Sequence, residues 1–193
     1  MRRVLIASLC SLIAAGGGCH SSHPSPGVSV VVEGGGRFPA ALAGRWKADR
    51  DGWEFVFDSE GRIASAVLSL GRVRIAPGQK TTMPTRGGGE GVFEPGEWAV
   101  YYEPSTSQLT IKVAMDHVRV EMGDSVLEGS AIDILSGAVS AAEGLWQVQW
   151  SAFNKYTVEG GAGPAVDLST HPEYGETKAL TFQRVSERRG AAK

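Results

Sequence analysis

The residues with the clearest potential for chemistry are the four histidines: His20, His23, His117 and His171. His171 is flanked by the carboxylates of Asp167 and Glu173, and Tyr174 follows. Imidazole, carboxylate and phenol groups bind polar ligands and transfer protons near neutral pH. We therefore predict that His171 and Tyr174 contact a ligand, with a solvated loop as the alternative reading of the same composition.

The other histidines lie in segments that favour simpler roles. His117 belongs to a run of mostly charged residues, 116–121, on the polar side of an expected strand. Such a run is typical of a solvated cross-strand charge ladder. His20 and His23 flank two serines in a segment rich in Ser, Pro and Gly. We expect adventitious metal binding there rather than a metal site.

The common catalytic and cofactor motifs are absent from the sequence. It contains no HExxH, GxSxG or CxxC motif and no Walker-type GK[ST]. Residues 49–52 resemble part of a calcium loop, but no bidentate Glu follows at the required distance, so a β-turn explains them better. We predict no metal, no cofactor and no enzymatic activity.

The largest apolar side chains are five tryptophans: Trp46, Trp53, Trp98, Trp146 and Trp150. Trp53, Trp146 and Trp150 occupy one side of alternating segments, which predicts that they face the interior of a sheet. Core packing is the usual role of such residues. In a hollow barrel the same faces line the cavity, since filled and hollow barrels share one binary pattern. With Trp46, these residues are the predicted lining of a site for a small apolar ligand.

Beyond residue 40, apolar and polar residues alternate with a period of two, which is typical of half-buried strands. The clearest runs are 53–58, 109–113, 118–122, 146–150 and 180–183. Turn residues separate the runs, at 51–52, 58–61, 104–107 and 122–124. Residues 39–42 suggest one helical turn. About ten strands predict an all-β fold, an antiparallel meander that closes into a barrel, with a β-sandwich as the alternative.

Two segments interrupt this rhythm, Thr81–Gly96 and Glu159–Glu176. Both are rich in Gly and Pro and longer than ordinary turns, and loops of this length are commonly functional or disordered. We predict two long loops, which are either variable or placed at the rim of a binding mouth.

The composition bounds the size and class of the protein. A chain of 193 residues that is 42% hydrophobic and 21% charged fits one globular domain with appendages. The net charge of −2 gives no electrostatic reason to expect a nucleic-acid partner.

The N-terminus has the pattern of an export signal. Arg2 and Arg3 precede an apolar run, 4–15, that is shorter than the roughly 20 residues of a membrane-spanning helix. The following Gly16-Gly17-Gly18-Cys19 resembles a bacterial lipobox, with Gly16 in place of the usual aliphatic residue. The resemblance implies that Cys19 is lipidated and becomes the first residue after cleavage. The alternative is a plain signal peptide cut nearby.

These features divide the chain into four parts. We predict a signal peptide over 1–18, a lipidated Cys with a flexible tether over 19–39, an all-β domain over 40–186 and a disordered tail over 187–193. Within the tether, Val28–Glu33 is a candidate extra strand. The expected location is the cell envelope, with the membrane as partner through the lipid anchor.

The start of the domain, Phe38–Trp46, is similar to the opening of lipocalin-type domains. There a short helical turn leads into Gly-x-Trp, here Gly44 to Trp46, and the Trp plugs the base of the barrel. The resemblance implies that Arg184, in the last strand, packs over this Trp. It also implies a barrel with a ligand mouth, although the Thr-Asp-Tyr motif of lipocalins is absent.

Two functions follow as expectations. The first is a lipid-anchored envelope protein that holds a small apolar or amphipathic ligand in its barrel. The second is a structural or interaction module whose barrel is filled and whose outer surface meets an as yet unknown protein partner.

Overall fold

The computed structural model describes residues 27–70, 72–161 and 163–185. The short helices are η1 (Glu33–Gly35) and η2 (Ala40–Leu42). The strands are β1 (Ser29–Val32), β2 (Gly44–Ala48), β3 (Glu54–Phe57), β4 (Ile63–Val67), β5 (Arg74–Ile75), β6 (Thr81–Pro84), β7 (Glu90–Pro95), β8 (Ala99–Glu103), β9 (Gln108–Met122), β10 (Ser125–Ser140), β11 (Leu145–Gly160), β12 (Val166–Asp167) and β13 (Glu176–Val185). The predicted all-β class is confirmed.

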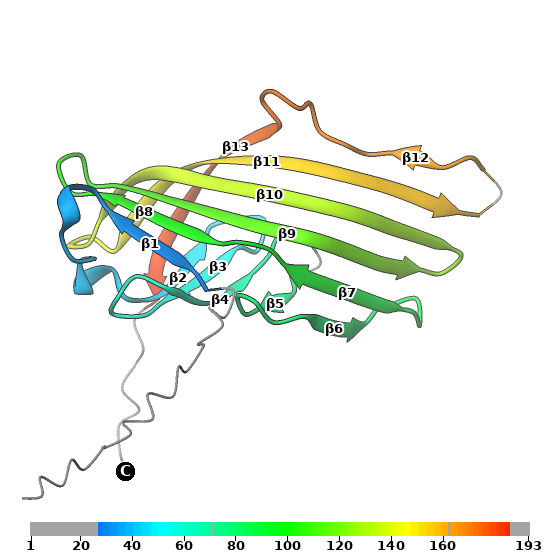
Figure 1. The fold of residues 1–193 in the computed structure, drawn as a ribbon, viewed down its shortest axis with the longest axis horizontal. Helices are drawn as coiled ribbons and strands as arrows, with labels where there is room; N and C mark the ends of the chain where they lie inside the picture. The colour runs from blue at the N-terminus through cyan, green and yellow to red at the C-terminus, as the bar shows by residue number, and fades with distance from the viewer. Residues whose placement is uncertain (1–26, 71, 162, 186–193) are drawn as a thin grey trace, which may run out of the picture.

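All 13 described strands belong to one sheet, whose main path runs in the order β1-β8-β9-β10-β11-β13-β2-β3-β4-β5. Off this path, β12 pairs with β11, and β7 pairs with β6 and β9. Figure 1 shows this sheet curled so that β2 to β5 lie across the inner face of β9 to β11. No hydrogen-bonded pairing in the described part of the chain joins β1 to β5, so the sheet is not closed into the predicted barrel. The meander is also not purely antiparallel, because β1 pairs parallel with β8.

Three strands are much longer than the rest. β9, β10 and β11 contain 15, 16 and 16 residues, whereas β2 to β5 contain 5 or fewer. One half of each long strand lies against the short strands, and the other half projects beyond them (Figure 1). On the projecting half, β7 and β12 pair with the outer two long strands. The interior of the curled sheet is therefore open where the short strands end, and this opening is here called the mouth.

A β-bulge divides β9 at this point. Met115 and Val118 are three positions apart and both buried, so the inward-facing residues change from odd-numbered to even-numbered between them. The pairing with β10 shifts at the same place, between Gly129 and Ala131. An extra residue in one strand produces this change of phase and increases the twist. Gly129 has φ +155°, and a Cβ there would lie 1.8 Å from the carbonyl oxygen of Lys155. Only glycine fits this close approach.

Aromatic side chains fill the base of the curled sheet. Trp46, Trp53 and Trp146 are completely buried. Phe55 and Phe182 pack between them, with the rings of Trp146 and Phe182 4.8 Å apart and those of Phe55 and Phe182 5.8 Å apart. Buried aromatic residues contribute large apolar areas to a core. This half of the interior is packed.

The base itself is covered by η2, which is the predicted helical turn at 39–42. The Trp46 indole Nε1 donates a hydrogen bond to the Leu42 carbonyl oxygen at 2.8 Å. Arg184, which pairs with Trp46 across β13 and β2, donates from its guanidinium to the Ala41 carbonyl oxygen at 2.9 Å. The Gly-x-Trp segment, the helical turn and Arg184 thus form one contact at the base.

Two boundaries differ from the sequence-based predictions. Val28–Glu33 was predicted as part of the tether, with a strand as the alternative. In the structure, Ser29–Val32 of this segment forms β1 and pairs with β8, so the sheet includes part of the predicted tether. Thr81–Gly96 is not a long loop but the β6–β7 hairpin, because β7 finds a long-range partner in β9. The five glycines of this segment had masked the alternation of apolar and polar residues.

The second predicted loop follows the edge of β11. Within Glu159–Glu176, β12 pairs with β11, and the Thr170 amide donates to the Asn154 carbonyl oxygen at 3.0 Å. The signal peptide, Cys19 and the tail at 187–193 lie outside the described residues.

Candidate functional site

The open mouth contains a pocket of about 550 Å³, here called the mouth pocket. Its wall is formed by the inward faces of β10 and β11, and its rim by the β2–β3 turn, the β4–β5 turn and the start of β13. The residues that matter most are Asp133, Trp150 and Tyr156 in the wall and Asp51, Arg72 and Lys178 at the rim. The volume falls within the range typical of small-molecule sites.

Asp133 is the one buried charged residue in the described part of the chain. The alternation of β10 places its side chain on the inward face, between the buried Ala131 and Leu135, and only 9% of the residue is exposed. Its one hydrogen bond among the described residues comes from the Trp150 indole Nε1 to Oδ1, at 2.8 Å. Burial raises the pKa of Asp133 to about 6, and the bond from Trp150 lowers it in part.

Tyr156 lies near Asp133 in the wall of the mouth pocket. Burial raises the pKa of its phenol, and the negative charge of Asp133 raises it further. The hydroxyl therefore stays protonated under physiological conditions and is able to donate a hydrogen bond. The mouth pocket thus combines an acceptor at Asp133 with a donor at Tyr156.

Two further polar atoms near the mouth have no partner among the described residues. They are the buried Oδ2 of Asp51 and the indole Nε1 of Trp53. The other four tryptophans donate their indole N–H to a backbone or carboxylate oxygen. Trp53 packs edge-on against Trp150, with ring centroids 5.8 Å apart. Buried polar groups without partners are rare and commonly mark sites that bind water or a ligand.

An apolar groove of about 570 Å³ adjoins the mouth pocket. The two share three residues of the β4–β5 turn, namely Ser69, Leu70 and Arg72. From there the groove continues over apolar side chains of β6, β7 and β9, which include Met83, Phe93, Val120 and Met122. A molecule lying across the β4–β5 turn would meet polar groups at one end and apolar groups at the other.

The rim already holds one cation against an aromatic face. The Lys178 ammonium lies 5.2 Å from the centroid of the Trp150 ring. It also pairs with Glu176 at 2.9 Å, and this hydrogen bond raises the pKa of Lys178. The geometry is that of a cation–π contact.

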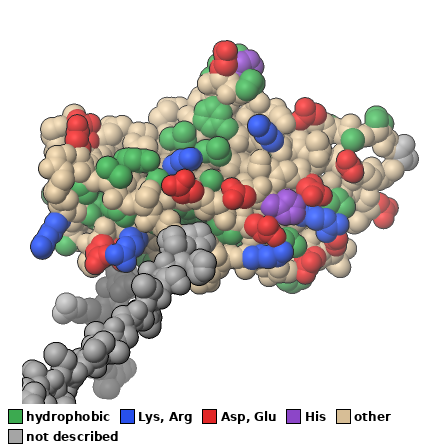
Figure 2. Space-filling view, viewed as in Figure 1, with side chains coloured by type: hydrophobic (Ala, Val, Ile, Leu, Met, Phe, Trp, Pro, Cys, Tyr) green, Lys and Arg blue, Asp and Glu red, His purple; other side chains and the backbone are tan. Residues whose placement is uncertain are grey.

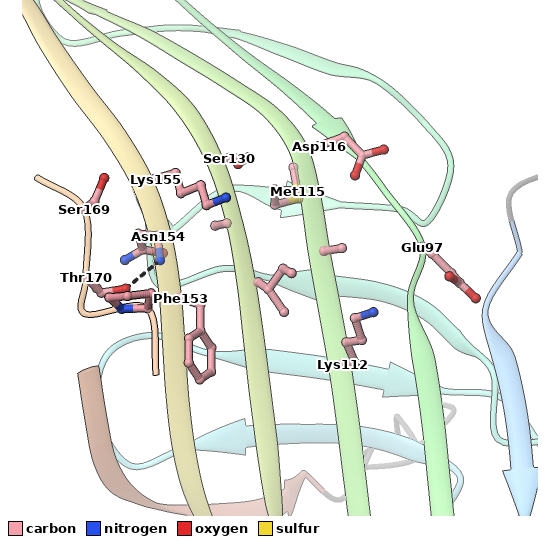
Figure 3. Close-up of a pocket in the computed structure, with 14 residues that line it drawn as sticks. Glu97, Lys112, Met115, Asp116, Ser130, Phe153, Asn154, Lys155, Ser169 and Thr170 are labelled. Atoms are coloured by element: carbon pink, nitrogen blue, oxygen red, sulfur yellow. Dashed lines mark hydrogen bonds between the residues drawn. The ribbon is translucent and has the colours of Figure 1, made fainter. Parts of the chain in front are cut away.

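A larger hollow, of about 950 Å³, lies on the outer face of β9 to β11. Figure 3 shows Thr170 at one edge of it and Glu97 at the other, with Phe153 and Lys112 between them. The dashed line marks the Asn154 amide donating to Thr170 Oγ1 at 2.9 Å. None of the charged residues that line this hollow is buried. The mouth pocket is therefore the stronger candidate.

The predicted charge ladder is present on the outer face, where acidic and basic side chains alternate over the sheet (Figure 2). His117 Nε2 lies 3.0 Å from a carboxylate oxygen of Glu128, and Arg119 pairs with Glu121 at 2.7 Å. These side chains are partly or fully exposed, as expected for a solvated ladder.

The structure separates the residues that the sequence grouped as a site. Trp150 lines the mouth pocket, whereas Trp46, Trp53 and Trp146 are buried in the packed base. His171 and Tyr174 stack with ring centroids 3.8 Å apart in an exposed turn, and neither lines the mouth pocket. Their contact with a ligand stays a prediction.

Sequence reasoning missed Asp133 and Tyr156. Asp133 lies in the segment Ala131-Ile132-Asp133-Ile134-Leu135. Its neighbours one and two positions away are all apolar, so the carboxylate lies among apolar residues whichever face of the strand is buried. An acidic residue within an apolar segment is a signal for a buried charge, since an unpaired charge is rarely buried without a function. Tyr156 carried no comparable signal.

In residues 27–70, 72–161 and 163–185, no group of three or more His, Cys, Asp or Glu side chains is arranged to hold a metal ion. Within those residues no helix is long and apolar enough to cross a membrane. Comparisons of the chain with family models, with curated proteins and with solved structures find no match.

Proposed function

We propose that this protein is a lipid-anchored component of the cell envelope that binds a small amphipathic ligand at the open mouth of a lipocalin-like, incompletely closed barrel. One observation carries the binding role: a buried carboxylate, Asp133, stands in the wall of an open pocket that continues into an apolar groove.

The energetics of Asp133 support a binding role over a packing role. An ionised carboxylate loses solvation when it is buried, and one hydrogen bond from Trp150 restores only part of the loss. An apolar side chain at this position would pack against Ala131 and Leu135 without that penalty. A carboxylate at this position is explained if a ligand supplies the hydrogen-bond donor or positive charge that the protein does not provide.

The base of the sheet supports the lipocalin-like part of the proposal. There the Trp46 indole donates to the Leu42 carbonyl oxygen of the helical turn, and the Arg184 guanidinium donates to the Ala41 carbonyl oxygen of the same turn. Cys19 remains the proposed attachment point of the lipid, on the strength of the lipobox-like segment before it.

The packed aromatic base favours a second candidate, a structural or interaction module that binds no small molecule. In that case the mouth pocket contains only water, and the protein acts through its outer face. The two candidates differ in whether the purified protein takes up amphipathic molecules.

Native mass spectrometry together with a fluorescent probe tests this difference. The full-length protein is titrated with N-phenyl-1-naphthylamine, a neutral apolar fluorophore, and the same preparation is weighed under native and denaturing conditions. We expect saturable fluorescence enhancement. Leu70→Asn, in the turn shared by the pocket and the groove, should weaken it, whereas Val31→Asn, on an exposed strand outside the mouth, should not. No bound mass and no saturable binding would contradict the proposal and favour the structural module.

A further inference from the structure

We infer that the ligand is a cationic amphiphile, whose protonated amine or guanidinium group binds Asp133 while its apolar chain lies in the groove over Leu70, Met83 and Met122. This inference rests on the proposed binding function and specifies the chemical class of the ligand.

The distribution of charge around the mouth pocket is the first argument. Asp51, Asp133 and Glu176 supply three carboxylates, whereas Arg72 and Lys178 supply two cations. Lys178 is already paired with Glu176 at the rim. Arg72 is exposed, and its side chain extends across the β2–β3 turn, within 3.2 Å of the position that a Cβ on Gly52 would take. The buried charge that lacks a counter-ion is negative.

The chemistry of the groups around Asp133 is the second argument. Trp150 donates to Oδ1 of Asp133, and its ring already accepts the ammonium of Lys178 at 5.2 Å. A carboxylate beside an aromatic face is a combination that binds alkylammonium and guanidinium groups, through an ion pair and a cation–π contact. The buried, unpartnered Oδ2 of Asp51 offers one more acceptor close to the mouth.

The same groups disfavour an anionic amphiphile such as a fatty acid. Its carboxylate would approach Asp133, and like charges in a desolvated site repel. Arg72 and Arg86 border the groove and are the alternative anchors for an anion. Both are exposed, and a water-exposed ion pair contributes little to affinity, because water and salt screen it. We therefore expect a buried carboxylate to contribute more to ligand selection than these two exposed guanidinium groups.

The inference is tested by displacement of N-phenyl-1-naphthylamine from the full-length protein by dodecylamine, dodecanol and dodecanoate, each below its aggregation concentration. The three share one chain and differ only in charge. At pH 7.5 we expect dodecylamine to bind at least about tenfold more tightly than dodecanol, which corresponds to about 1.4 kcal/mol. Asp133→Asn should abolish this preference, because the affinity for dodecylamine falls to about that for dodecanol. Glu159→Gln removes one exposed negative charge outside the mouth pocket and should preserve the preference.

The outcomes separate this inference from the function on which it rests. If dodecanol and dodecylamine bind equally and Asp133→Asn has no effect, the cationic class is wrong but the binding function stands. If dodecanoate binds most tightly and Arg72→Gln or Arg86→Gln weakens it, the ligand is anionic and the inference is overturned. If Glu159→Gln reduces the preference as much as Asp133→Asn, the attraction is non-specific and the inference fails. If none of the three displaces the probe and the probe itself does not bind, both proposals fail.

Discussion

Asp133→Asn should make the ligand-free protein more stable at neutral pH. The substitution removes the buried charge but keeps an oxygen that accepts the hydrogen bond from Trp150. The pKa of Asp133 rises from 3.8 to about 6 on folding, because burial disfavours the charged carboxylate. The folded state therefore binds the proton more tightly than the unfolded state, so the free energy of unfolding falls as pH rises through this interval.

The magnitude follows from the size of the shift. A difference of about two pKa units at 1.36 kcal/mol each corresponds to a penalty of about 3 kcal/mol above pH 6, and to almost none below pH 4. We expect Asp133→Asn to raise the free energy of unfolding by about 2–3 kcal/mol at pH 7.5 and by less than about 0.5 kcal/mol at pH 4.

Urea denaturation at both pH values, followed by tryptophan fluorescence, measures this difference. The other titratable and charged groups of the mouth pocket are the same in both proteins: Asp51, Arg72, Tyr156, Glu176 and Lys178. Their contributions largely cancel when the two proteins are compared at one pH. Asp133→Leu is the matched control, because it also removes the charge but leaves the Trp150 indole without an acceptor, and it should stabilise less. If Asp133→Asn were destabilising at pH 7.5 and its effect did not change with pH, the carboxylate would already be compensated in the folded protein.

Three other substitutions test the fold and the anchor. Gly129→Ala should lower the free energy of unfolding by at least about 2 kcal/mol, because the new Cβ would overlap the Lys155 carbonyl oxygen. Urea denaturation measures this loss, and an unchanged stability would contradict the bulge geometry. Trp46→Phe removes the indole bond to Leu42 and part of the plug at the base, and should cost about 1–3 kcal/mol in the same assay, with near-native stability refuting that role. Cys19→Ser should move the protein from the membrane fraction to the soluble fraction and abolish incorporation of radiolabelled palmitate, whereas unchanged fractionation would exclude the lipid anchor.

The alternation of residues predicted the faces of the strands well, because each strand's period is a local property. Trp53, Phe55 and Phe57 are buried on one face as expected, and so are Trp146 and Val148. The helical turn before Trp46 was also predictable, since Pro39 and the Gly-x-Trp segment are adjacent in sequence.

Long-range pairing was not predictable in the same way. The parallel pairing of Ser29–Val32 with β8 joins segments about seventy residues apart, and nothing in either segment specifies the other. The hairpin within Thr81–Gly96 depends on β9 as its partner, and the change of phase at Met115 depends on a bulge that a strict period of two does not include. The mouth pocket results from these events, because it lies where short strands end beside long ones.

The position of Asp133 is best understood together with the aromatic base. The buried rings of Trp46, Trp53 and Trp146, none of which lines the mouth pocket, contribute apolar burial to the packed base of the sheet. That burial offsets a destabilising carboxylate in the other half, where β10 and β11 extend beyond the short strands. A filled base and an open mouth are therefore compatible in one sheet. Proteins commonly retain such locally unfavourable groups where binding requires them. The packed core, which by itself favours a purely structural role, is equally the feature that lets the mouth hold an uncompensated charge.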